Sequence, residues 1–475
     1  MTREDLAKVH DDYTSFLPEW LFYVRSYMGG KFYRDGDYLL QHPFESKENY
    51  ERRKKTAYYY NYCAPIVDIM GGYLYKKSPK RSYGDLSPVP VPPRQPKTLF
   101  DRFWWDVDFC GSSFDQFMRE AQRYASIYGR VSIIVDKPQA SPLTKAAAFA
   151  QDIRPYLSMV TPENLLDWQF TRLANGRPVL SFAKILESVD GRKKRYRIWK
   201  RDSWELWEAG EKEIQLLEIQ DNPLGEVPII NLYNKRSGIR MVGLSDIKDI
   251  AGINRNIYYL CSDAKEIIEN TAFPMLALPY EKVAAEDNKV GPKNILQFDP
   301  DQPNSRPSWL EAPHSSLAEI REWVMQDASE IARVALMGGI RNIEQSTQPW
   351  TGVAIEAQAQ QLYAVLAEKA DNAEQSELDI LRLWAKWEGA EFKGNVEYRR
   401  DFAVKDATTS LQNAISAGTA NINSLTFEKA RQKKIVSSTL TEIEEAEIKI
   451  IEEEIDGLKE LPQANPAPAA QTMGA

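Results

Sequence analysis

The sequence predicts an α+β fold with several long helices in its second half. A capped helical pattern, "SSFDQFMREAQRYASIYGR", runs directly into "VSIIVD", a β-branched strand pattern. Residues 153–235 then alternate strand and turn patterns, as an antiparallel sheet does. From about Gly243 onward, helical periodicity continues over unusually long stretches. Together these features predict a body of sheet and helix from which long helices continue.

The N-terminal part is helix-like and rich in tyrosine over residues 13–80. The prolines of "SPVPVPPRQPK", residues 87–97, indicate an extended linker or surface arm. In the helix that follows, Ser112 or Ser113 is the expected N-cap and Gly129 is the expected stop. The strand after Gly129 is expected to be buried, because its residues are almost all apolar.

The strand patterns of residues 153–235 predict an antiparallel sheet. They are "RPVLSFAKILE", "KRYRIWKRDSWELWEA" and "IQLLEIQ", each bounded by turn residues. The Asp190-Gly191 dipeptide is the expected hairpin turn between two of them. The same hairpin holds the most basic run of the chain, "GRKKRYR", which we interpret as a solvated hairpin rather than as a phosphate-binding patch.

Two long helices are expected on either side of a compact insert. The first covers Leu244–Ala272 with Ser245 as its cap, and it would be roughly 40 Å long. Residues 273–313 carry short strand patterns and many prolines. The second helix begins at Ser315 with "SSLAEIREWVMQDASEIARVALMGG". Helices joined in this way can lie antiparallel, with the insert at their far end.

A third long helix is expected from Thr351 to about Phe392, after a polar loop that begins with two glycines. Its small and apolar positions step by three and four residues, which makes a narrow packing seam: Ile355, Ala359, Leu362, Leu366, Ala370 and Ala373. "VEYRRDF" is an expected strand. From Thr408 to Glu460 the sequence is helical and increasingly acidic, with one apolar face of Ile448, Ile451, Ile455 and Leu458. The low-complexity tail is expected to be disordered.

The composition excludes several function classes. The net charge of −8 argues against tight, non-specific DNA binding over the whole surface, because that affinity comes from Lys and Arg. The three cysteines lie far apart, so neither a disulfide framework nor a zinc site is expected. The N-terminus lacks the apolar region of a secretory signal, and no run is long enough to span a bilayer.

No catalytic set can be assembled from the candidate motifs. "GGYLYKKS" lacks the second glycine of a phosphate-binding loop, because Lys76 occupies its place. The three histidines fall in separate segments, and the pairs "DVD" and "DPD" are expected in turns or near a helix start. We therefore expect no enzyme activity, no metal site and no cofactor.

The order of several motifs resembles that of tailed-bacteriophage portal proteins, of the siphophage type in particular. The similar segments, in chain order, are "YYNYCAPIVDIMGGYLYKKSP", "YASIYGRVSIIVDKP", "LSMVTPENLLDWQF", "INRNIYYLCSDAKE", "TGVAIEAQAQQL", and "VEYRRDF" followed by "LQNAISAGTANINSLTFEKA". Each is weak alone, and the resemblance rests on their succession from about Tyr13 to Glu460. Family members often carry Ser-Gly where this chain has Thr351-Gly352.

The resemblance implies a portal fold with a mixed α/β wing, two antiparallel stem helices bracketing a small α/β clip, a long wing helix and a helical crown. The implied boundaries are wing 1–243 with the arm 87–97, stem helices 244–272 and 314–337, clip 273–313, channel loop 338–351, long wing helix with return strand 352–399, crown 400–460 and disordered tail 461–475. It also implies a ring, typically a dodecamer, at one capsid vertex. That ring would pass double-stranded DNA during packaging and ejection.

The channel loop holds the candidate site residues. Weak, sequence-independent DNA contacts are expected from Arg341, Asn342, Gln345, Ser346, Thr347 and Gln348. A hinge or anchor is expected from Gly338, Gly339, Trp350, Thr351 and Gly352. The implied partners are further copies of the chain, DNA, the large terminase subunit, a head–tail adaptor, and the major capsid and scaffolding proteins, with no membrane. The implied location is the virion, after assembly in the host bacterial cytoplasm. The alternatives are a packaging ATPase or nuclease, which needs an intact phosphate loop, and another head–tail adaptor.

Overall fold

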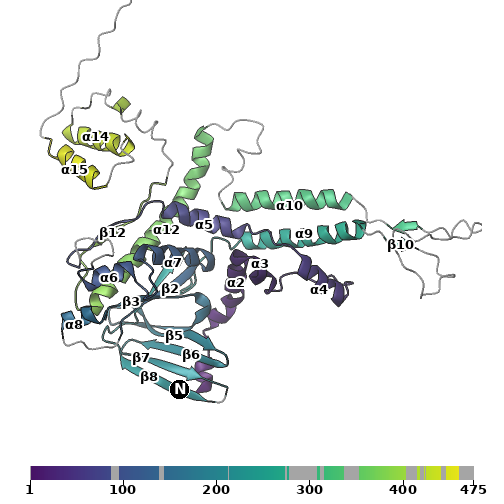
Figure 1. The fold of residues 1–475 in the computed structure, drawn as a ribbon, viewed down its shortest axis with the longest axis horizontal. Coiled ribbons are helices and arrows are strands. Elements are labelled where there is room, and N and C mark those ends of the chain that lie inside the picture. The colour runs from purple at the N-terminus through teal and green to yellow at the C-terminus, as the bar shows by residue number, and fades with distance from the viewer. Residues whose placement is uncertain are drawn as a thin grey trace, which may run out of the picture. The chain divides into compact units, whose positions relative to one another are not determined.

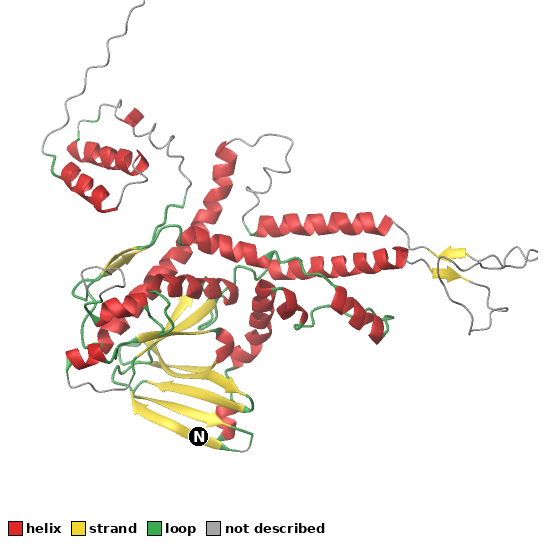
Figure 2. Cartoon of the chain, viewed as in Figure 1, coloured by secondary structure: helices red, strands yellow, loops and turns green. Residues whose placement is uncertain are grey.

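The computed structural model describes twelve stretches of the chain. They are residues 2–86, 96–138, 144–211, 213–272, 275–277, 308–310, 315–335, 352–402, 415–417, 422, 424–439 and 445–458. The chain divides into two compact units, Met1–Phe402 and Ala403–Ala475. Both strands and helices build the first unit, which confirms the α+β class (Figure 2).

The N-terminal part of the first unit is helical, as expected. Its helices are α1 (Arg3–Ala7), α2 (Asp11–Met28), α3 (Gly30–Arg34), α4 (Lys47–Thr56), α5 (Cys63–Leu74) and α6 (Leu99–Trp105). The "GGYLYKKS" stretch is the last turn of α5 and the residues after it, with Lys76 and Lys77 exposed. The chain then forms β1 (Lys80–Ser82), a strand that the sequence did not predict.

Helix α7 (Phe114–Tyr128) and strand β2 (Arg130–Asp136) form the predicted helix–strand unit. Ser113 accepts a hydrogen bond from the amide of Gln116 and so caps the helix. Gly129 ends it with φ of 88°, a conformation that favours glycine. All seven residues of β2 are buried, as expected for a strand that is covered on both faces.

A three-stranded antiparallel sheet has the order β3-β2-β9, with β3 (Tyr156–Val160) and β9 (Ile229–Tyr233) at its edges. The side chains of β2 alternate between two cores. Val131, Ile133 and Val135 pack into the core shared with α5, α7 and α12, whereas Ile134 packs toward the larger sheet. This sheet is therefore the middle layer, with helices on one side and the larger sheet on the other (Figure 1). The short elements α8 (Lys145–Ala150) and η1 (Pro162–Asn164) flank β3 in the sequence.

The larger sheet is an antiparallel meander of five consecutive strands, which confirms the prediction for residues 153–235. They are β4 (Leu165–Arg172), β5 (Pro178–Asp190), β6 (Lys193–Lys200), β7 (Ser203–Ala209) and β8 (Ile214–Asp221). Asp190 pairs with Lys193, so Gly191 and Arg192 form the two-residue turn. The predicted Asp190-Gly191 turn was thus displaced by one residue, because Gly191, at φ 57°, takes the first turn position.

Helix α9 (Ile250–Ala272) and helix α10 (Ser315–Val334) are the predicted pair of long helices. Between them in the sequence, β10 (Met275–Ala277) pairs antiparallel with β11 (Ser308–Leu310). The prediction that Ser245 begins the first helix was wrong by about a turn. Its hydroxyl accepts the amide of Ile247 in a separate turn, and the helix begins at Ile250.

Helix α12 (Gly352–Trp387) is the longest helix, and it ends before the predicted Phe392. Gly389, with φ of 68°, lies just beyond its end. Four residues of the predicted seam are buried: Leu362, Leu366, Ala370 and Ala373. Only part of "VEYRRDF" is a strand, β12 (Asn395–Glu397), which pairs with β1.

The second unit contains α14 (Leu425–Thr439) and α15 (Glu445–Asp456) among its described residues. On the predicted apolar face of α15, Ile455 is buried, whereas Leu458 lies beyond the helix and is exposed. Lys433 of α14 forms an ion pair with Asp456 at 2.7 Å. None of the described helices in either unit has the length and apolar character of a membrane span.

Candidate functional site

The most distinctive feature of the first unit is the pair of helices α9 and α10. They run side by side, and β10 lies at their far end from the body (Figure 1). Their contact is apolar where it joins the body, through Ile257 of α9 and Ile331 of α10, both buried. About one turn from Ile331 on α10, Asp327 Oδ2 accepts a hydrogen bond from Asn256 Nδ2 of α9 at 2.7 Å. The two helices therefore form one packed hairpin.

A buried polar cluster fixes the base of α9 to α12. Lys369 Nζ of α12 lies 2.6 Å from Asp246 Oδ2, and both side chains are buried. The same ammonium donates to Asn234 Oδ1 and, at 3.3 Å, to Ser126 Oγ. Asn234 Nδ2 in turn donates to Asp246 Oδ1 at 2.8 Å. One lysine thus joins four segments of the chain. Its charge is both paired and hydrogen-bonded, which a buried charge needs in order to be stable.

A close backbone approach lies beside this cluster. Gly129, at the end of α7, and Gly243, before α9, touch so closely that a Cβ on either would collide with the backbone of the other. The amide of Leu244 also donates to Lys235 O at 2.8 Å. The chain therefore enters α9 along a path that only glycines allow.

A second buried ion pair holds α12 to the helical face of the body. The guanidinium of Arg81, from β1, contacts the carboxylate of Glu377 and lies 2.7 Å from Asp115 Oδ1 of α7. The hydroxyl of Tyr398 donates to Glu377 Oε2 at 2.8 Å. Burial raises the pKa of Glu377, and the charge of Arg81 opposes that rise. This cluster was not predicted from the sequence.

Helix α4 braces the outer side of α9 with basic residues. Arg53 is buried and forms a two-point ion pair with Glu45, with both N–O distances 2.8 Å. Its Nη1 also donates to Ser262 Oγ of α9 at 3.3 Å. Arg52 reaches two carboxylates farther along α9, Glu266 at 2.9 Å and Glu269 at 3.3 Å. The acidic side of α9 is therefore neutralised within the chain.

The hairpin leaves large apolar side chains exposed. Trp323 and Met325 on α10 and Ile268 on α9 are each 54% exposed. Trp323 and Met325 are two positions apart and lie on different faces of α10, so each is a separate apolar side chain that is open to association with another chain. In a single chain these residues have no apolar cover among the described residues.

The structure does not describe ten of the eleven predicted site residues. Arg341, Asn342, Gln345, Ser346, Thr347, Gln348, Gly338, Gly339, Trp350 and Thr351 lie outside the described residues. Gly352 is the first residue of α12. The described residues fix the two ends between which this loop must run, Ala335 after α10 and Gly352.

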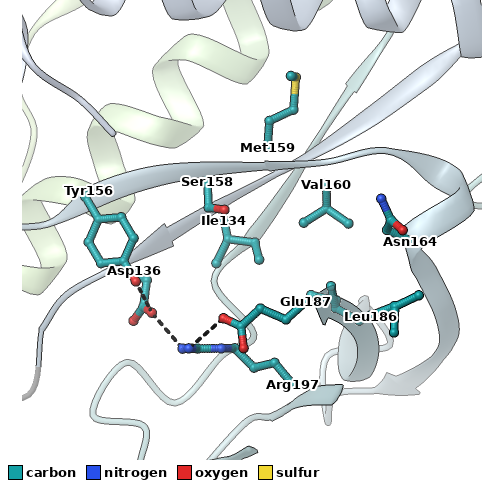
Figure 3. A pocket seen from close by; sticks show the side chains of 11 residues that line it. Ile134, Asp136, Tyr156, Ser158, Met159, Val160, Asn164, Leu186, Glu187 and Arg197 are labelled. Atoms are coloured by element: carbon teal, nitrogen blue, oxygen red, sulfur yellow. Dashed lines mark hydrogen bonds and ion pairs between the residues drawn. The ribbon is translucent and has the colours of Figure 1, made fainter. Parts of the chain in front are cut away.

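A small polar pocket of about 130 Å³ lies where the two sheets meet (Figure 3). Asp136 accepts hydrogen bonds from the Tyr156 hydroxyl at 2.9 Å and from Arg197 Nη1 at 3.1 Å. Arg197 also pairs with Glu187 at 2.8 Å. Burial raises the pKa of Asp136, and Arg197 opposes the rise. Asp136, Tyr156, Arg197 and Glu187 bond to one another, with only the buried Nε of Arg197 left without a partner among the described residues of this group, and we assign the group to the junction of the sheets.

The other catalytic candidates are not brought together. His10 caps α2 and stacks on Trp168, with ring centroids 4.2 Å apart, whereas His42 lies 3.2 Å from Asp263. The "DVD" carboxylates follow the end of α6 instead of starting a helix, and Asp108 accepts the amides of Cys110 and Ser112. Within the described stretches, no three His, Cys, Asp or Glu side chains are placed to hold a metal ion. Residues 191–195 of the "GRKKRYR" hairpin are exposed, and Lys193 and Arg195 both pair with Glu208.

Comparison with known proteins gives a partial family match and coarse structural matches. The family described as "Domain of unknown function (DUF4055)" matches residues 246–388, which span α9, α10 and α12. No curated protein sequence matches the chain. The chain is similar to one in the structure "Neck of empty GTA particle computed with C6 symmetry", with 12% identity, TM-score 0.43, and coverage of 84% of this chain and 96% of that chain. It is also similar to a chain in the structure "Virion of native gene transfer agent (GTA) particle", with 12% identity, TM-score 0.41, and coverage of 76% of this chain and 86% of that chain.

Proposed function

We propose that this protein is a portal-type structural protein of a tailed-bacteriophage-like virion. Copies of it assemble into a ring at one vertex of the capsid, and double-stranded DNA passes through the ring. The ring docks the large terminase subunit while DNA is packaged and a head–tail adaptor afterwards. It contacts the major capsid and scaffolding proteins from the side. The chain itself has no enzymatic role and needs no cofactor.

The observation that carries the proposal is the order of elements in the first unit. An α+β body leads into α9, a short strand ladder separates α9 from α10, and α12 follows. The sequence motifs that resemble portal proteins imply this order of wing, stem, clip, stem and long wing helix. Both the hairpin of α9 with α10 and the rigid attachment of α12 support that assignment.

The mechanism follows from rigidity combined with weak contacts. The cluster around Lys369 ties α12 to the segment before α9 through a buried ion pair and a buried hydrogen bond. The loop would then touch DNA through neutral polar groups and Arg341. Such contacts position a duplex without reading bases, and they break easily as the duplex moves. The acidic character of the chain, at −8, opposes tight retention of DNA.

The direct test is electron microscopy of the purified full-length chain in negative stain, with an ATPase assay on the same sample. We expect rings with a central hole and no ATP turnover above buffer. A discrete monomer that hydrolyses ATP would refute the proposal in favour of a packaging motor subunit.

The role of the loop is tested separately by deleting Glu344–Gln348. We expect rings to form but capsids to lose full-length DNA. Normal retention of full-length DNA by capsids that carry the deletion would remove the loop from the mechanism while leaving the ring assignment intact.

A further inference from the structure

Strand β9 leaves one edge of the three-stranded sheet without a partner strand among the described residues. The sheet order β3-β2-β9 places β9 at the edge. The amide of Asn234 donates to Gly129 O, and the amide of Val135 donates to Pro228 O. In an antiparallel pair every second residue bonds to the neighbouring strand, and these two bonds show which residues of β9 do so. The N–H and C=O groups of Asn231 and Tyr233 therefore point away from β2.

The outward groups of β9 are only partly satisfied. Ser376 Oγ of α12 donates to Asn231 O over a long distance of 3.4 Å. The amides of Asn231 and Tyr233 have no hydrogen-bond partner within the described part of the chain. An unpaired strand edge with free N–H groups is a template for another extended chain.

A groove of about 610 Å³ runs along this edge. Helix α12 forms one wall, and the other is formed by Phe170 of β4 and by the loop from Arg236 to Met241. Five Lys and Arg residues line the groove against two carboxylates: Arg177, Arg236, Arg240, Arg382 and Lys386 against Glu226 and Asp379. The groove is thus strongly basic in a chain whose net charge is −8.

The cations on the two walls of the groove differ in whether they already have a carboxylate partner. On α12, Arg382 and Lys386 are already paired with Asp379 and Glu226. On the opposite wall, Arg236 lies over the ring of Tyr233 at 4.6 Å, and Arg240 lies over the ring of Phe170 at 5.2 Å. Neither has a carboxylate partner among the described residues. Stacking holds a guanidinium in place and leaves its N–H edge free for an incoming anion.

We propose that this groove binds an extended acidic peptide segment of a partner protein, which adds as a strand to the open edge of β9. Its backbone would pair with the free amides of Asn231 and Tyr233, which supplies affinity. Its carboxylates would meet Arg236, Arg240 and Arg177, which supplies charge complementarity. An acidic peptide fits better than a nucleic acid, because the free edge offers hydrogen bonds in the repeat of a polypeptide backbone, which a nucleic acid lacks.

The probe is a fluorescent ten-residue peptide that alternates glutamate with valine and threonine. We expect it to bind the full-length protein, measured by fluorescence anisotropy. The double variant Arg236→Gln/Arg240→Gln should bind at least about tenfold more weakly, since two charge-assisted contacts are lost. The matched control Arg34→Gln/Lys47→Gln removes the same charge from exposed positions on α3 and α4 and should bind as the wild type does.

Two further peptides and one hydrogen-exchange measurement distinguish strand addition from general charge attraction. A peptide with proline at alternate positions cannot pair its backbone and should not bind. A version with glutamine for glutamate should bind much more weakly. Hydrogen exchange at the amides of Asn231 and Tyr233 should slow when the first peptide is bound, whereas the amides already bonded to β2 should change less.

Equal binding of the proline peptide, or unchanged exchange at β9, would overturn strand addition. Absence of peptide binding would overturn the proposal as a whole. Binding of a twelve-base-pair duplex that depends on Arg236 and Arg240, in place of peptide binding, would identify the groove as a nucleic-acid site instead.

Discussion

At the residue scale, Lys369 is a side chain whose loss should strongly destabilise the first unit. Lys369→Met leaves the buried Asp246 without its cation, and breaking a buried pair on one side costs about 3–5 kcal/mol. We expect that loss in the free energy of unfolding, measured by urea denaturation. Arg382→Met breaks an exposed ion pair with Asp379 and should cost less than about 1 kcal/mol. Equal losses for the two variants would contradict the structural role of the Lys369 cluster.

Glu45 should make the stability of the α4 region depend on pH. Hydrogen bonds from Arg53 lower the pKa of Glu45, so the folded state binds this proton less readily than the unfolded state. The stabilisation of the folded state by ionised Glu45 is therefore fully present above the ordinary glutamate pKa, and it is lost as pH falls through the lowered pKa. Glu45→Gln should lower the melting temperature at pH 7, and its difference from the wild type should stay constant down to about pH 5 and shrink as pH falls further to 3.5. A difference that stays constant down to pH 3.5 would contradict the linkage.

The sequence could not have predicted these clusters. Lys369 and Asp246 are 123 positions apart, and Arg81 and Glu377 are 296 apart. Each is an ordinary charged residue within its own helix, strand or turn pattern. Only the packing of α12 across the sheet brings the partners together, and periodicity within one segment carries no information about that packing.

At the element scale, helix boundaries were predicted well where residues within a few positions determine them. Ser113 and Gly129 bound α7 as expected, because a side-chain cap and a left-handed glycine act within a few residues. The ends of α9 and α12 were predicted less well. At Ser245 the hydroxyl caps a separate turn, and tertiary bonds from Leu244 to Lys235 and from Asp246 to Ser126 delay the helix. The edge groove beside β9 escaped prediction because its cations come from separate segments.

The exposed apolar residues of α10 give an element-scale prediction about assembly. If neighbouring copies pack against the hairpin, Trp323→Ser/Met325→Ser should weaken the ring. The melting temperature of the dissociated chain should change little, because both side chains are exposed in one chain. Light scattering after size-exclusion chromatography would report the mass. The control Val189→Ser/Ile219→Ser removes two exposed apolar side chains from the five-stranded sheet and should leave the ring intact. Loss of the ring in the control alone would place the interface on that sheet.

At the scale of the whole molecule, the sequence predicted the α+β body, the long helices and a separate helical C-terminal part. The structure divides the chain into two compact units after Phe402. This division has a physical basis, because among the described residues the four clusters of buried apolar side chains draw only on residues up to Phe402. The second unit buries few apolar side chains among its described residues, with Ile455 the clearest.

Truncation should therefore separate the two units cleanly. A chain of residues 1–402 keeps every member of those clusters, and we expect it to unfold within about 3 °C of the first unit in the full chain. A chain of residues 1–387 ends with α12 and loses Val396, Tyr398 and Phe402, all buried in the main core. It also leaves Glu377 without the Tyr398 hydroxyl and β1 without its partner strand. Three large buried side chains contribute several kcal/mol, so this shorter chain should melt far lower or fail to fold. Calorimetry on both truncated chains measures these melting temperatures. Similar melting temperatures for the two would show that β12 is not part of the core. Strong destabilisation of the chain 1–402 would show that the first unit depends on the second.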